Sequence, residues 1–168
     1  MDDVVLKEID LPDVGVPRLC PELPPALYAA RLDRLRARIA AEGLDAVAIY
    51  GDREHFANIA WASGVDPRFE EALLIVVPGR TPVYVAGPET KGMAEAAPVE
   101  LQVAGYPPFG LLGQDRAGTP RLSELLAGAG LAPGQWIGVA GWKFFTGPEF
   151  ADPERALEVP SYLADALR

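Results

Sequence analysis

The order of apolar and polar positions along the chain predicts alternating helices and strands. In residues 26–42 the apolar side chains recur at spacings of four, three and four, which places them on one stripe of a helix. That stripe consists of Tyr28, Leu32, Leu35 and Ile39. Gly43 is typical of the residue that follows a helix end. Residues 46–50 (AVAIY) are almost continuously apolar, which indicates a strand buried on both faces.

The following segment predicts a second helix and then a β-hairpin. Asp52 precedes residues 53–63 and is expected to cap that helix, because its side chain can accept from free N–H groups of the first turn. Phe56, Ile59 and Ala60 form the expected inner face, and Gly64 closes the helix. Residues 72–77 and 83–86 are predicted strands, and the turn PGRTP between them predicts antiparallel pairing.

The rest of the chain continues the same alternation. A helix is expected at 89–97, a half-covered strand at 99–103, a loop at 105–118 and a strand at 136–140. Thr119 and Pro120 predict the start of another helix, with Leu122, Leu125 and Leu126 facing inward. We therefore predict an α/β, three-layer sandwich. Its sheet is mixed, mainly parallel and five- to six-stranded, with one β-hairpin and helices on both faces.

Length and composition indicate one globular domain of 168 residues. Five prolines in residues 1–25 predict an extended amino-terminal arm, laid over the domain or partly disordered. The folded domain is expected at 26–160, and residues 161–168 are expected to begin a further helix. A single cysteine, Cys20, excludes an internal disulfide and a thiolate metal cluster, and it is expected to be structural or merely exposed.

Charge and hydropathy narrow the classes of partner. The net charge is −9, from 24 acidic and 15 basic residues, so an electrostatic nucleic-acid binder or anionic-membrane binder is not expected. No apolar run approaches the roughly 20 residues of a membrane span, and the first residues do not have the pattern of a secretory signal. The sequence therefore favours a cytoplasmic protein.

Most catalytic motifs are absent from the sequence. The chain has one histidine, His55, so an H-E-x-x-H zinc site cannot form. There is no G-x-S-x-G elbow and no phosphate loop. Residues 128–134 (GAGLAPG) follow a helix and precede a strand, which is the reverse of a dinucleotide-binding loop, so they are interpreted as a connector.

Residues 51–74 hold the remaining candidates for chemistry. His55 beside Asp52 or Glu54 has the composition of a general base with an orienting carboxylate, or of an ordinary structural or surface residue. Arg68 with Glu70 and Glu71 fits either a ligand clamp or a salt-bridged loop. Residue type fits both alternatives in each case. A complete active site cannot be assembled from these residues, and no catalytic residue or metal ligand is assigned.

The run from Arg31 to Val76 resembles the start of the creatinase/prolidase/aminopeptidase P family. GLDAVAIYGDREHFANIAWASG (43–64) carries most of the likeness, and the hairpin 78–89, WIGVAGWKFF (136–145) and PSYLADALR (160–168) extend it over about 26–168. The resemblance implies a non-catalytic amino-terminal domain. Residues 161–168 would then begin the linker helix to a metallopeptidase domain that this sequence lacks. Two divalent ions of the Mn, Zn or Co type are expected in that other domain and none in this chain.

The resemblance also implies partners and residue roles. Members of the family are commonly dimers in which this domain leans over an active-site mouth, often that of the neighbouring subunit. Carried over to this chain, Arg68 would bind a carboxylate, Phe69 would cover or stack on a peptide or small amide substrate, and Glu70 would bind an amino terminus. His55 would lie at the rim or directly behind the residues that touch substrate, and Arg53 would face the substrate or the partner.

Three functions follow from these observations. In the first, the chain is the dimerising and substrate-selecting domain of an Xaa-Pro peptidase, prolidase or creatinase-like hydrolase, and is inactive alone. In the second, it is a stand-alone binding or oligomerisation module with the same fold. The third, a stand-alone enzyme that uses His55, is the least supported by the residues present.

Overall fold

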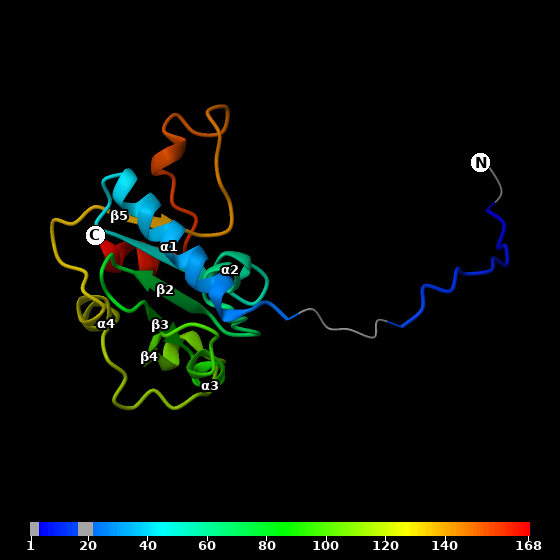
Figure 1. The fold of residues 1–168 in the computed structure, drawn as a ribbon, viewed down its shortest axis with the longest axis horizontal. Coiled ribbons are helices and arrows are strands. Elements are labelled where there is room, and N and C mark those ends of the chain that lie inside the picture. The colour runs from blue at the N-terminus through cyan, green and yellow to red at the C-terminus, as the bar shows by residue number, and fades with distance from the viewer. Residues whose placement is uncertain (1–3, 17–21) are drawn as a thin grey trace.

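The structure is a computed structural model that describes residues 4–16 and 22–168. Its elements follow the order α1 (Pro25–Ala41), β1 (Ala46–Gly51), α2 (Ala57–Ser63), β2 (Ala72–Val76), β3 (Val83–Ala86), α3 (Lys91–Glu95), β4 (Gln102–Gly105), η1 (Pro107–Phe109), α4 (Leu122–Gly128), β5 (Ile137–Ala140), η2 (Pro153–Arg155) and α5 (Ser161–Leu167). Figure 1 shows them gathered around one sheet, with the amino-terminal arm extending away from it.

The five strands form one mixed sheet in the order β4-β3-β2-β1-β5. β2 pairs antiparallel with both β1 and β3, whereas β1–β5 and β3–β4 are parallel pairs. Four strands therefore run in one direction and β2 alone runs in the other. This topology confirms the predicted α/β fold, its mainly parallel mixed sheet and its single hairpin.

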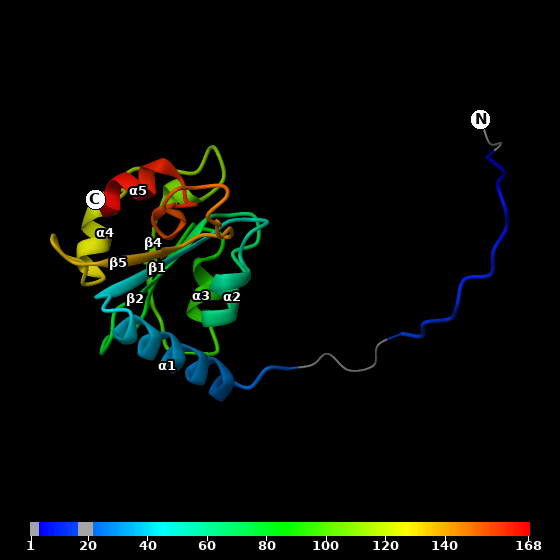
Figure 2. The same cartoon turned by 90° about the horizontal axis from the view of Figure 1, so that it is seen from above.

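Helices cover both faces of the sheet, as predicted. Alternate residues of a strand point to opposite faces, and β2 divides accordingly: Leu73 and Ile75 pack in one apolar cluster, Leu74 and Val76 in the other. The first cluster includes Leu126 of α4 and Leu163 of α5, and the second includes residues of α1, α2 and α3. Figure 2 shows these two helical layers on either side of the strands.

The helix α1 matches its predicted stripe. Leu32 and Ile39 are buried, and Leu35 packs against the same cluster. Pro25 occupies the first helical position, where its missing N–H leaves no hydrogen bond unmade. Gly43 has φ +66°, a backbone conformation that glycine adopts without strain. The sequence pattern therefore located this helix to within one residue at each end.

Two predicted helix starts are wrong. Asp52 does not cap α2: its Oδ1 accepts from the backbone N–H groups of Glu54 and His55, and this turn places the helix start later, at Ala57. Thr119 does not cap α4, because its hydroxyl donates to the carbonyl of Arg116 at 2.7 Å. In both cases a short polar side chain is satisfied by a turn that precedes the helix.

Other boundaries shift because pairing partners set them. The strand expected at 99–103 is observed at Gln102–Gly105, since its partner β3 begins only at Val83, opposite Gln102.

The remaining expected elements are also present. The helix expected at 89–97 is the short α3, and the loop expected at 105–118 contains η1. Ile59 is buried as predicted, and Phe56 and Ala60 are half-buried.

The described part of the arm, residues 4–16 and 22–24, is exposed and has no helix or strand. Figures 1 and 2 show residues 4–16 leading away from the domain. The predicted role of Cys20 lies outside the described residues. None of the helices described is both long enough and apolar enough to cross a bilayer.

Candidate functional site

One edge of the sheet gathers the polar and aromatic side chains of interest. β1, β3, β4 and β5 run in the same direction, so their carboxyl ends meet there, and Glu70 and Glu71 lead into the reversed strand β2 at the same edge. In open α/β sheets, ligands bind outside the carboxyl ends of strands. We call this side of the molecule the carboxyl edge.

Asp52 and His55 lie together at the end of β1. His55 Nδ1 is 3.0 Å from Asp52 Oδ1, and both side chains are about one-third exposed. Partial burial raises the pKa of the Asp52 carboxyl, but hydrogen bonds from the N–H groups of Glu54 and His55 and from the His55 ring outweigh it, so the pKa lies below its ordinary value. The carboxylate therefore orients the imidazole, as the sequence allowed.

An aromatic partner from the segment after β5 completes this cluster. The His55 ring stacks on Trp142 with centroids 3.9 Å apart and planes 15° apart. The Lys143 ammonium lies 4.2 Å from the Trp142 ring centroid, within the range of a cation–π contact. The Trp142 indole therefore contacts both the His55 imidazole and the Lys143 ammonium. Trp142 remains 43% exposed.

Hydrogen bonds fix the segment that carries Trp142. The side-chain amide of Asn58, on α2, donates to the carbonyl of Gly141 at 2.7 Å. Glu158 accepts from the backbone N–H of Trp142 at 2.8 Å and from that of Lys143 at 3.4 Å. The segment is thus held by Asn58, 83 residues before Gly141, and by Glu158, 16 residues after Trp142.

A second polar cluster links β1, β2 and α5. The hydroxyl of Tyr162 donates to Glu71 Oε2. Burial raises the pKa of Tyr50 and of Tyr162 well above the ordinary tyrosine value, and the Glu71 carboxylate raises both further. These hydroxyls therefore remain protonated donors throughout the neutral range. Leu163, next to Tyr162, is fully buried, so α5 packs as part of this domain.

Glu70 is the most buried of the predicted site residues, at 2% exposure. Its Oε1 accepts from the N–H of Glu89 at 3.1 Å, and its Oε2 accepts from the N–H and hydroxyl of Thr90 at 2.9 and 2.7 Å. A Cβ added at Gly87 would come within 2.5 Å of this carboxylate. Glu70 thus ties the loops after β3 to β2, in place of the substrate-facing role expected for it.

Arg68 and Phe69 lie at the tip of the loop before β2. Arg68 has φ +59°, and it is the only non-glycine residue with positive φ in the described chain. Its N–H donates to Asp66 Oδ1 at 2.7 Å, and the N–H of Glu70 donates to the carbonyl of Pro67 at 3.1 Å. This tight turn leaves Arg68 exposed and Phe69 47% exposed. Arg53 is exposed as well.

The predicted residues are therefore only partly brought together. His55 pairs with Asp52, but within the described chain no hydrogen bond or ring contact joins it to Arg68 or Phe69. Sequence reasoning missed Trp142, Lys143 and Tyr162. The available signal was the position of Trp142 and Lys143 directly after a strand that ends at the carboxyl edge.

The residues described do not fit a metal centre. No three histidine, cysteine or acidic side chains among residues 4–16 and 22–168 lie close enough to share an ion. His55 already has its Nδ1 against Asp52 and its ring against Trp142. In this geometry Asp52 orients the His55 imidazole and Trp142 contacts it. The described residues offer no set of ligands for the two ions that the family resemblance implies.

A family model matches residues 31–141 of the chain, and its description is creatinase/prolidase N-terminal domain. This match covers more than half of the sequence. The chain belongs to the creatinase/prolidase N-terminal domain family. The predicted family is therefore confirmed, and the candidate site of this creatinase/prolidase N-terminal domain is the carboxyl edge of its sheet.

Solved structures that a structural search matched include the N-terminal domain of an X-Pro dipeptidase from Streptococcus pyogenes, at 23% identity and TM-score 0.39, covering 46% of this chain and 56% of that one. A proline dipeptidase from Streptococcus agalactiae is 17% identical, with TM-score 0.45, covering 66% of this chain and 74% of that one. Dipeptidase PepE from Mycobacterium ulcerans is 17% identical, with TM-score 0.45, and the match covers 65% of this chain and 27% of that one. This chain thus spans about a quarter to three quarters of these structures. A search of curated proteins found no match.

Proposed function

We propose that this domain selects substrate for a metal-dependent Xaa-Pro peptidase, prolidase or creatinase-like hydrolase without performing the reaction itself. The observation that carries the proposal is the match of residues 31–141 to the creatinase/prolidase N-terminal domain. Its partner would be a metallopeptidase domain that holds two divalent ions. That domain would be joined to the carboxyl-terminal side of α5. A homodimer in the cytoplasm is part of the same proposal.

The carboxyl edge would face the mouth of an active site, that of the neighbouring subunit in a dimer. Arg68 is exposed on a short, hydrogen-bonded turn, so its guanidinium is available to a substrate carboxylate. Phe69 beside it offers a half-exposed ring that excludes water or stacks on the substrate. His55 and Arg53 would form the rim, with the imidazole held by Asp52 and Trp142. Glu70 supports the loop from below.

Kinetics on the polypeptide that joins this domain to the peptidase domain would test the role of Arg68. Arg68→Ala keeps a non-glycine side chain at the positive φ but removes the guanidinium, so we expect KM for an Xaa-Pro peptide to rise about tenfold, the equivalent of one lost charged hydrogen bond. Arg38→Ala on α1 is the control, because Arg38 is exposed and pairs only with Glu42. Unchanged KM and kcat in Arg68→Ala would refute the clamp.

The gene itself tests the proposed architecture. An open frame that continues past codon 168 with histidine, aspartate and glutamate ligands would support a fused peptidase domain. A stop codon directly after Arg168 would favour the second function, a stand-alone binding or oligomerisation module. Fractionation of host cells would check the proposed cytoplasmic location.

A further inference from the structure

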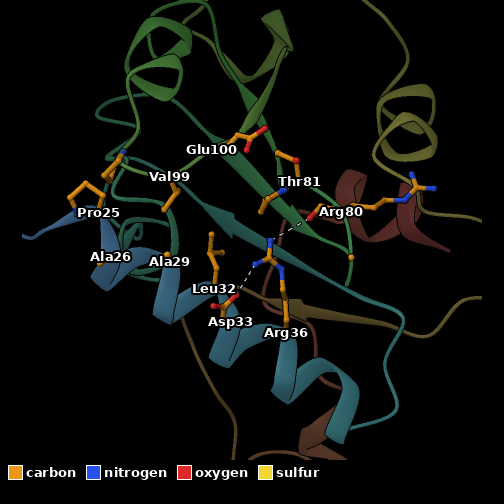
Figure 3. Close-up of a pocket in the computed structure, with 13 residues that line it drawn as sticks. Pro25, Ala26, Ala29, Leu32, Asp33, Arg36, Arg80, Thr81, Val99 and Glu100 are labelled. Atoms are coloured by element: carbon orange, nitrogen blue, oxygen red, sulfur yellow. Dashed lines mark hydrogen bonds and ion pairs between the residues drawn. The ribbon is translucent and has the colours of Figure 1, made fainter.

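A groove of about 570 Å³ lies on the side of the molecule where α1 begins, away from the carboxyl edge. Figure 3 shows Ala29 and Leu32 of α1 on one wall and Thr81 and Val99 on the other. Most of the lining is small or apolar, and residues 79–82 between β2 and β3 form part of it. Its volume lies within the range of sites that hold a drug-sized ligand, so it can accept only part of a longer extended segment.

Arg36 closes one end of this groove. Its guanidinium donates to Asp33 Oδ1 at 3.0 Å and to the carbonyl of Arg80 at 3.4 Å, which ties α1 to the β2–β3 turn (Figure 3). Glu100 contributes a carboxylate to the opposite wall. The groove lining therefore carries two residues of each charge, the acidic Asp33 and Glu100 and the basic Arg36 and Arg80, beside its apolar floor.

The arm carries a complementary set of side chains. Its apolar residues are exposed by 68–99%, and no hydrogen bond joins residues 4–16 to the domain in the described chain. Apart from Val5, they occur as pairs two residues apart, a spacing that puts both members of a pair on one face of an extended segment. The pairs are Val4 with Leu6, Ile9 with Leu11, and Val14 with Val16.

Charge also favours contact between the arm and α1. Residues 4–16 contain Lys7 and three acidic residues, a net charge of −2. The helix α1 contains four arginines and one aspartate, a net charge of +3 in a chain whose total is −9. An acidic, apolar segment is therefore attracted to the basic helix α1, whose Arg36 lines the groove.

The direction of the arm favours a second molecule over its own groove. Pro25 lines the groove, so the arm is attached at the groove's mouth. Pro24 is extended, with φ −67° and ψ 148°, and residues 4–16 lead away from the domain in both views (Figures 1 and 2). Residues 22–24, the described residues next to α1, contain no turn that would bring the arm back onto its own groove.

We propose that the groove beside α1 binds the arm, residues 4–16, of a second copy of this chain. Reciprocal exchange of two arms makes a closed, twofold-symmetric dimer, in which each arm covers the groove of the other molecule. The inference does not rest on the peptidase assignment, because neither the arm nor the groove includes a residue of the carboxyl edge.

Light scattering of the 168-residue chain, with reductant present to keep Cys20 from cross-linking, measures the exchange. We expect a dimer for the intact chain and a monomer after removal of residues 1–16. The truncated chain should still fold, because residues 4–16 belong to neither apolar cluster. A dimer that persists unchanged after truncation would overturn the proposal.

A labelled peptide of residues 4–16, titrated into the truncated chain, tests the groove itself. Ala29→Trp fills the groove, and Ala30→Trp is its matched control on the same helix, exposed and outside the lining. We expect saturable binding that weakens at least tenfold in Ala29→Trp and is unchanged in Ala30→Trp. No binding, or equal binding by both variants, would overturn the groove as the site. Peptide binding together with a monomeric intact chain would show that the arm fills its own groove, and would overturn the exchange.

Discussion

Replacement of Glu70 by glutamine should destabilise the domain although it changes only one atom. The carboxylate accepts three hydrogen bonds through its two oxygens. A glutamine has one acceptor oxygen, and its NH₂ group would face an N–H or hydroxyl donor at the other position. If its oxygen takes the two bonds from Thr90, the NH₂ group opposes the N–H of Glu89. At least one donor is then left without an acceptor.

The magnitude follows from the burial of the site. A hydrogen bond to a charged group contributes about 1.5–3 kcal/mol, and a buried donor left unpaired costs about 1–3 kcal/mol. Glu70 is 2% exposed, so solvent screens these hydrogen bonds little. We expect Glu70→Gln to lower the free energy of unfolding by about 2 kcal/mol. Glu70→Ala should lower it by about 4 kcal/mol, because it leaves all three donors unpaired.

Urea unfolding followed by tryptophan fluorescence measures this loss. With a urea m-value of about 2 kcal/mol/M, a loss of about 2 kcal/mol lowers the unfolding midpoint by about 1 M. Glu100→Gln is the control, since Glu100 is exposed and should leave the midpoint in place. A Glu70→Gln midpoint within about 0.2 M of the parent, at equal m-value, would mean that the carboxylate does not hold the loops as described.

Three further predictions follow. Arg68→Gly should raise the free energy of unfolding by about 0.5–1 kcal/mol relative to Arg68→Ala in the same urea assay, because glycine has no penalty at φ +59°; equal midpoints would refute this. The raised pKa of Tyr162 means that its bond to Glu71 stabilises the fold fully below about pH 10, the ordinary value, and less as pH rises towards the folded pKa. Tyr162→Phe should therefore lower the unfolding midpoint at pH 7 and flatten its fall above pH 10; an unchanged alkaline profile would contradict the contact. His55→Ala should alter the tryptophan fluorescence of the parent but not of a Trp142→Phe variant, because the imidazole stacks on that indole alone.

Sequence patterns predicted the parts of the fold that depend on local spacing. The apolar stripe of α1 and the apolar runs of β1 and β2 could be recognised from the sequence. Burial of one face or of both faces gives a regular pattern of apolar residues close together in the chain. Helix starts were less well predicted. Asp52 and Thr119 are good capping residues by type, but each is satisfied by a neighbouring turn, and residue type alone does not distinguish the two uses.

The candidate site was harder to predict because its contacts are remote in sequence. Trp142 stacks on a histidine 87 residues away, and Tyr162 meets a glutamate 91 residues away. No periodicity marks such pairs. Glu70 was assigned to a ligand from its neighbours Arg68 and Phe69, yet one residue along this turn separates a solvent-facing side chain from a buried one. Only the path of the backbone decides between them.

The contact between Glu70 and two glycines restricts how related sequences can change. A Cβ at Gly87 would come within 2.5 Å of the carboxylate, and one at Gly110 within 3.0 Å. Positions 70 and 87 should therefore vary together across the family: where the glutamate is kept, Gly87 should be kept, and where it becomes small and apolar, a larger residue becomes permissible at 87. Gly110 should be kept in both cases, because a Cβ there would also come within 2.8 Å of Pro88 Cδ. An alignment of related domains would show the covariation of positions 70 and 87 as a linked pair of columns.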